Sequence, residues 1–157
     1  MALTTHKNHI PAIYRIVFTI IDPLIASWGA YLNLFTPAFA VNAVVPATLS
    51  PDVPLHHFLN HQIAGGLLVC VVSDIFLLMQ TSEIWIWKRI QAGQLLYDFV
   101  ILWSTWYSLG QQGRLSVASL RVEDWGGIAI VGTVAVLRTA FCLGIGLTNT
   151  AQRTKRS

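Results

Sequence analysis

Each of the four most apolar stretches of this 157-residue chain carries one ionisable residue in its interior. The stretches read FTIIDPLIA, VVSDIFLLM, LLYDFVILW and AVLRTAFCL, and their charged members are Asp22, Asp74, Asp98 and Arg138. A charged side chain in the hydrocarbon core of a bilayer costs about 3 kcal/mol or more. The four residues are therefore expected to face one another inside a helical bundle, around a polar cavity.

The composition predicts a membrane protein. Hydrophobic residues make up 54% of the chain and charged residues 11%, with a mean hydropathy of +0.58. Soluble domains carry about 25% charged residues. The length leaves room for one transmembrane domain, residues 1–157. The net charge of +3 is small and lies mostly at segment ends, so no nucleic-acid partner is predicted; the predicted partners are the lipid bilayer and an apolar small molecule.

The predicted fold is all-α, an integral membrane four-helix bundle. Spans of about 20 apolar residues can be placed four times. The expected positions are residues 12–35, 58–80, 87–109 and 125–147. The first span is interrupted at Asp22-Pro23, because proline removes a backbone donor.

The distribution of basic residues predicts both termini in the cytoplasm. Four spans put the two termini and the second loop on one side, with the basic residues Lys7, Lys88, Arg89, Arg153, Lys155 and Arg156. The first loop, residues 36–57, has no Lys or Arg and is expected to cover the luminal face. Its prolines, which disfavour helix, are Pro37, Pro46, Pro51 and Pro54. The C-terminal residues 153–157 are similar to a dilysine-type endoplasmic reticulum retrieval signal, and a positive-inside anchor explains them equally well.

The four ionisable residues are predicted to share one layer of the membrane. At about 1.5 Å of rise per residue, each lies roughly 9–16 Å below the cytoplasmic boundary. Gln91, Gln94 and Asp98 follow helical steps along one face of the third span. The predicted substrate-binding residues are Gln94, Tyr97, Tyr14 and Arg15, together with His61 for a substrate that enters from the side of the first loop.

The histidines near the second span are expected to lie at the membrane interface without a metal. His57 and His61 stand four residues apart, with His56 adjacent, a spacing that can present two imidazoles to a metal. A metal needs a third or fourth ligand, and Asp52 is the only acidic residue nearby. Interfacial histidines without a metal are therefore predicted. No nucleotide or haem motif occurs, and no cofactor is expected.

Three carboxylates and one guanidinium support acid–base chemistry. One carboxylate can activate water, and a second, kept protonated by burial, can deliver a proton to an oxygen leaving group. An arginine can orient both through its fork. Asp22, Asp74 and Asp98 would divide these roles, without an assignment of acid and base among them. The set resembles the Asp-Arg-Asp site of soluble limonene-epoxide-type hydrolases, in chemistry and not in fold.

Most of the chain also resembles small four-span integral membrane proteins of filamentous fungi, some encoded beside polyketide or meroterpenoid biosynthetic genes. The likeness is carried by YRIVFTIIDPL, HHFLNHQIAGG and QAGQLLYDF. The resemblance implies an enzyme of the endoplasmic reticulum that hydrolyses or cyclises epoxidised polyenes.

Two further functions stay open at this point. Asp–Arg pairs can lock a bundle, which suits a non-enzymatic scaffold for biosynthetic enzymes. Buried carboxylates also suit a proton-coupled transporter. Four spans would then have to form a homodimer, and no inverted repeat is visible to support it.

Overall fold

The computed structural model describes residues 10–50 and 52–147, and all regular structure in these ranges is helical. Three stretches are long and apolar enough to cross a membrane: Ala12–Phe35, Pro54–Leu78 and Val122–Leu143. Large apolar side chains also face outward, as on a lipid-exposed surface; Leu24, Leu96 and Trp103 are each about two-thirds exposed. The predicted all-α fold, with helices long and apolar enough to span a membrane, is thereby confirmed.

The first span is continuous through its proline. It consists of α1 (Ala12–Ile16), the π-helical segment η1 (Val17–Ile21) and α2 (Asp22–Phe35). Pro23 takes the second position of α2, two residues after the end of the π-helical segment. The predicted interruption at Asp22-Pro23 is therefore a local widening of the helix rather than a break.

The loop after the first span contains short helices, contrary to the expectation that its prolines would prevent them. Pro37 begins α3 (Pro37–Asn42), and Pro54 begins the 3-10 turn η2 (Pro54–His56). Proline is well tolerated at a first helical position, where its missing N–H has no partner anyway. Pro51 lies outside the described residues.

Two long helical stretches and a final helix complete the fold. The second span is α4 (His57–Val72), continued by the π-helical segment η3 (Ser73–Leu78). The third helix, α5, is longer than predicted (Ile84–Gln111), and a short turn, η4 (Val117–Ser119), leads to α6 (Val122–Cys142). The fourth helix stops five residues before the predicted 147, because Gly144 and Gly146 adopt positive φ angles of 84° and 76°.

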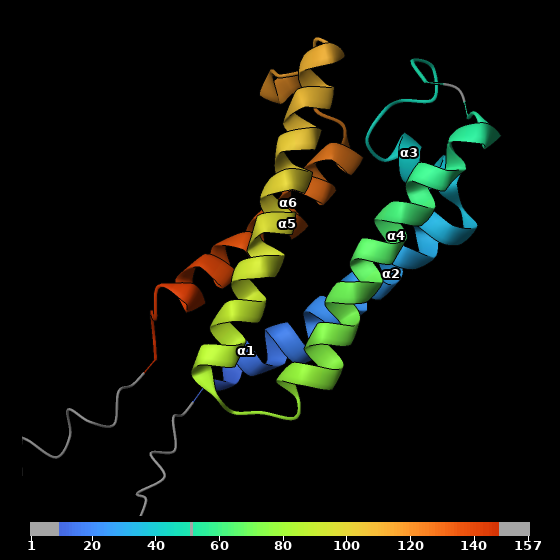
Figure 1. Ribbon diagram of the computed structural model, residues 1–157. Helices are drawn as coiled ribbons and strands as arrows, with labels where there is room; N and C mark the ends of the chain where they lie inside the picture. The colour runs from blue at the N-terminus through green and yellow to red at the C-terminus, as the bar shows by residue number, and fades with distance from the viewer. Residues whose placement is uncertain (1–9, 51, 148–157) are drawn as a thin grey trace, which may run out of the picture.

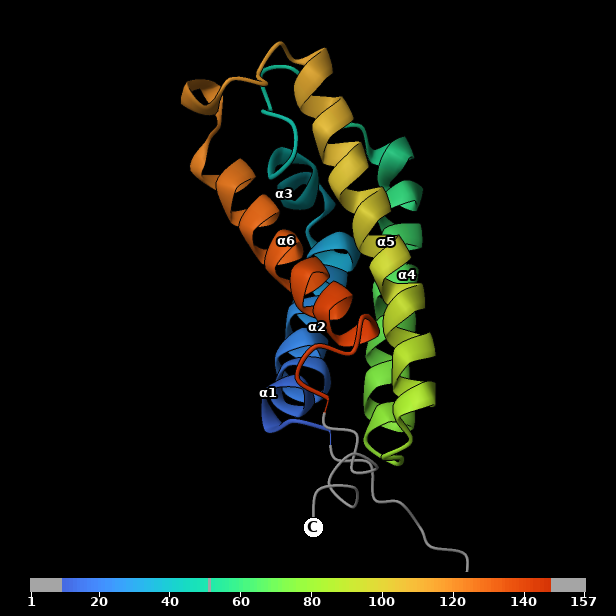
Figure 2. The same ribbon diagram turned by 90° about the vertical axis from the view of Figure 1, so that its left-hand side faces the viewer.

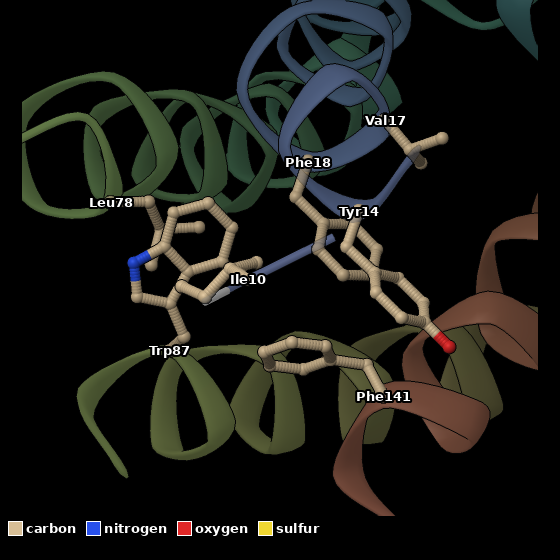
Figure 3. Close-up of a cluster of buried hydrophobic side chains, with 7 residues drawn as sticks. All are labelled: Ile10, Tyr14, Val17, Phe18, Leu78, Trp87 and Phe141. Carbon is tan, nitrogen blue, oxygen red and sulfur yellow. The ribbon is translucent and has the colours of Figure 1, made fainter. Parts of the chain in front are cut away.

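The helices pack as two pairs, α2 with α4 and α5 with α6 (Figure 1). The pairs meet at the end where α1 begins, which we call the aromatic end. A buried cluster closes it (Figure 3), with Ile10, Tyr14, Val17, Phe18, Leu78, Trp87 and Phe141 as its members. The ring of Phe141 in α6 packs edge-on against Tyr14 and Phe18 from the first span. The first and last described residues both lie at this end.

At the opposite end, the chain at the end of α3 and just after it lies near the α5–α6 connection (Figure 2). The guanidinium of Arg121 donates to the backbone carbonyls of Asn42 and Ala43. Arg121 and Arg114 both pair with the buried Asp124 at the start of α6. The long first loop is therefore held to the α5–α6 connection by hydrogen bonds.

Candidate active site

Arg138 of α6 is the centre of a buried polar cluster between the two helix pairs. Its Nη2 donates to Asp22 of α2, and its Nη1 donates to Asp98 of α5. The Nε donates to the side-chain oxygen of Gln91 at 3.1 Å, and Nη1 also approaches the backbone carbonyl of Gln94 at 3.4 Å. The arginine is only 3% exposed. One guanidinium therefore fixes three helices through fork-shaped, charge-assisted hydrogen bonds.

Local helix geometry helps to place two of the carboxylates. Asp22 directly follows the π-helical turn η1, and Asp74 lies inside the π-helical segment η3. The two π-helical segments contact each other. A π-turn shifts the direction of the following side chains, and such turns are frequent at functional sites.

Asp74 joins the cluster indirectly. Its Oδ1 accepts a hydrogen bond from the Gln94 side-chain nitrogen at 2.9 Å, and the residue is fully buried. Gln94 thus links the two parts of the cluster, since its backbone carbonyl faces Arg138 while its amide holds Asp74. Among the described residues, no cation pairs with Asp74.

Three buried polar atoms of the cluster have no partner within residues 10–50 and 52–147: Asp74 Oδ2, Gln91 Nε2 and Gln94 Oε1. A buried polar atom without a hydrogen bond costs about 1–3 kcal/mol. Buried polar atoms in folded proteins are usually hydrogen-bonded. The cluster therefore has unused hydrogen-bonding capacity.

A cavity of about 190 Å³ opens beside the guanidinium. Asp22, Asp98, Tyr97 and Arg138 contribute its polar wall, and apolar residues of α2, α4, α5 and α6 form the rest, among them Ile25, Leu67, Ile101 and Val134. Asp74 does not line this cavity. A small molecule in it would meet two carboxyls and one guanidinium in otherwise apolar surroundings, which is the usual build of a ligand pocket.

The structure brings together only part of the predicted site. Asp22 and Asp98 both contact Arg138, Asp74 is reached through Gln94, and Tyr97 lines the cavity. Gln91 was expected only to share their helix face, and it bonds directly to Arg138. Its position one helical turn before Gln94 on that face was the signal for this role.

Three of the predicted substrate-binding residues lie elsewhere. Tyr14 belongs to the aromatic end, where its hydroxyl donates to the Ile145 carbonyl at 2.9 Å. Arg15 is exposed and bonds to Ser82 at 2.7 Å. His61 is exposed on α4 and does not line this cavity. None of the three lines the cavity beside Arg138.

One of the histidines near the start of α4 makes a local contact with an acidic residue. His57 shares a hydrogen bond of 2.7 Å with Asp52 in the loop before α4. Within the described part of the chain, no group of three or more His, Cys, Asp or Glu side chains is arranged to hold a metal ion.

Changing Tyr14 to Phe should leave any turnover at the cavity beside Arg138 unaltered. The substitution removes one hydrogen bond at the aromatic end and keeps the ring packing, so the free energy of unfolding should fall by about 1 kcal/mol. Thermal unfolding in detergent and a turnover assay measure the two quantities. A loss of activity without a loss of stability would put Tyr14 back in the site.

Residues 7–148 match the family described as Domain of unknown function (DUF7704). The chain belongs to this family. The match covers both the cluster around Arg138 and all the helices that line the cavity. Comparisons with curated proteins and with solved structures gave no match. Membership of the DUF7704 family therefore identifies no activity.

Proposed function

We propose that this DUF7704 protein is a membrane-embedded acid–base enzyme that opens epoxides of an apolar polyene, by hydrolysis or by cyclisation. One observation carries the proposal: a single buried guanidinium is shared by two carboxyl groups from different helices at the wall of a cavity. The reaction needs an acid and a base held close together, and this pair supplies both.

The charge balance favours one proton on the pair. Asp22, Asp98 and Arg138 are each at least nine-tenths buried, and no other cation among the described residues pairs with either carboxyl. Two carboxylates against one guanidinium would leave a net negative charge in low-dielectric surroundings. Two acidic groups sharing a site resolve this by keeping one of them protonated. The result is a neutral acid beside a charged base.

The proposed reaction starts with one carboxyl of the pair neutral and the other charged. The neutral carboxyl donates its proton to the epoxide oxygen as the carbon–oxygen bond breaks. The charged carboxylate takes a proton from water, or from a hydroxyl of the substrate, whose oxygen forms the new bond to carbon. Water as nucleophile gives a diol, and an internal hydroxyl gives a cyclic ether. The two carboxyls end with exchanged protonation states, and a proton transfer between them restores the site.

Arg138 stays charged throughout and holds both carboxyls in place. Its contacts to Gln91 and to the Gln94 carbonyl limit its own movement. Positioning of this kind lowers the barrier because the reacting groups need no reorganisation. Tyr97, which lines the same cavity, is available to hold a substrate oxygen.

For the membrane arrangement we propose four spans with both termini in the cytoplasm. α5 is long enough at 28 residues, about 42 Å. Its polar residues Gln91, Gln94 and Asp98 are buried against Arg138 and the second span rather than facing lipid. Residence in the endoplasmic reticulum belongs to the same proposal. The basic residues behind both points include Lys7, Arg153, Lys155 and Arg156, which lie outside the described residues.

The experiment is product analysis in isotopically labelled water. The protein, reconstituted in nanodiscs, is given linear polyene epoxides in ¹⁸O-water, with empty nanodiscs as the control. We expect a diol that carries one labelled oxygen, or an unlabelled cyclic ether where the substrate has a suitable hydroxyl. Conversion no faster than in empty nanodiscs, across epoxides of several lengths, would contradict the proposal.

A further inference from the structure

A second hollow lies beside the cavity, between the second span and α5. It is a groove of about 420 Å³, and residues that line it include Gly66, Cys70, Ser73, Arg89, Gly93 and Tyr97. Small residues leave the space open: a Cβ added at Gly93 would meet no atom within 4 Å. The groove lies where the two helix pairs adjoin each other along α4 and α5.

Tyr97 and Cys70 line both the groove and the cavity. The phenol lies against Gly66, where an added Cβ would stand 3.2 Å from the hydroxyl oxygen. That hydroxyl reaches the Ile63 carbonyl only at 3.5 Å, a long hydrogen bond that holds the ring weakly. A small movement of the Tyr97 ring would join the two hollows into one.

The two ends of the groove differ in polarity. Arg89 lies at one end, exposed, with its guanidinium 5.8 Å from the centre of the Trp85 ring. Within residues 10–50 and 52–147, no carboxylate pairs with Arg89. Tyr97 is eight residues further along the same helix, about 12 Å away. Gln94 lies between them, is nine-tenths buried, and has a side-chain oxygen without a partner.

We propose that this groove binds the substrate, and that the substrate is an amphipathic molecule with an anionic head group. The head pairs with Arg89, and the apolar chain lies along Gly93 as far as Tyr97. The end of the chain then enters the cavity beside Asp98. The reacting carbon would lie about 12 Å or more from the acidic head. Its identity as a substrate, rather than a ligand, rests on the proposed function.

The head-group contact is tested with parinaric acid, a fluorescent linear polyene carboxylic acid, and its uncharged methyl ester. Binding to detergent-solubilised protein is measured by polyene fluorescence, after subtraction of protein-free micelles. Arg89→Gln should weaken binding of the acid about tenfold, as expected for a lost charge-assisted hydrogen bond, and leave the ester unaffected. Lys88→Gln is the matched control, because Lys88 is next in sequence and its side chain points toward Gly144. Equal affinity of wild type and Arg89→Gln for the acid would overturn the proposal, as would wild type that does not bind the acid.

The groove itself is tested by filling it. Gly93→Leu should weaken binding of both the acid and the ester about tenfold, because the new side chain occupies the path of the chain. Leucine favours helix over glycine, so the variant should fold. Gly65→Leu is the control, since Gly65 also has open space around it and does not line the groove. Unchanged binding to Gly93→Leu would show that the groove is not occupied.

The binding results stand apart from the proposed reaction. Parinaric acid carries no epoxide, so its binding is measured without any reaction taking place. Binding without turnover by wild type would therefore refute the epoxide chemistry and leave the groove assignment in place. Turnover without Arg89-dependent binding would refute the groove assignment and leave the epoxide chemistry in place.

Discussion

Arg138→Met should abolish turnover and lower the free energy of unfolding by about 3–5 kcal/mol, the usual cost of removing one partner from a buried ion pair. The methionine fills similar space, so the loss reflects charge and hydrogen bonding rather than a cavity. Two carboxyls and Gln91 would then lose their shared partner inside the bundle. Thermal or denaturant unfolding in detergent, together with the epoxide assay, measures both effects.

Arg138→Lys is the control for charge alone. A lysine keeps one positive charge and loses the planar fork that reaches Asp22 and Asp98 together. Its stability should fall between those of wild type and Arg138→Met, with turnover still strongly reduced. If Arg138→Met unfolded with wild-type stability, the arginine would not be the buried partner that the structure shows.

Asp98→Asn and Asp22→Asn should each reduce turnover by about 10²–10⁴-fold, the range that general acid–base groups contribute. Asparagine has nearly the same shape and cannot exchange a proton at working pH, so the bundle should keep its packing. Removing one of two carboxyls also matches the remaining one to the single guanidinium. Both variants should therefore stay folded, as judged by gel filtration and thermal unfolding.

Asp74→Asn is the matched control in the same bundle. Asp74 touches Gln94 and does not line the cavity, so its loss should reduce turnover less than the other two changes. An equal loss in all three variants would return Asp74 to the shared acid–base role predicted from the sequence. Wild-type turnover in both Asp22→Asn and Asp98→Asn would remove the carboxyls from the chemistry altogether.

The sequence predicts that the charged residues of this bundle contact one another, because a charged side chain that faced lipid would be costly. Depth along each span gave the right layer for Asp22, Asp98 and Arg138, which touch in the structure. Depth alone does not give direction around the helix axis. That is why Asp74, at a similar depth, proves to face Gln94 and not the guanidinium.

The positions of Arg15 and Tyr14 and the pairing of the helices could not be predicted, because they depend on contacts between segments far apart in the sequence. Arg15 lies on the helix face of Asp22 but two turns nearer the end, where it meets Ser82. Tyr14 packs with Phe141 from the opposite end of the chain. The division into two helix pairs, and the groove that it leaves beside α5, follow from long-range packing that periodicity does not reveal.

The most direct test of the acid–base site is the triple variant Asp22→Asn/Asp98→Asn/Arg138→Gln, studied for stability and turnover together. Replacing all three ionisable groups at once leaves neither side of the Asp–Arg ion pairs without its partner, so we expect a free energy of unfolding within about 2 kcal/mol of wild type. We also expect no epoxide opening above the rate of empty nanodiscs. A triple variant that folds and still opens epoxides at the wild-type rate would show that these charges only hold the bundle together.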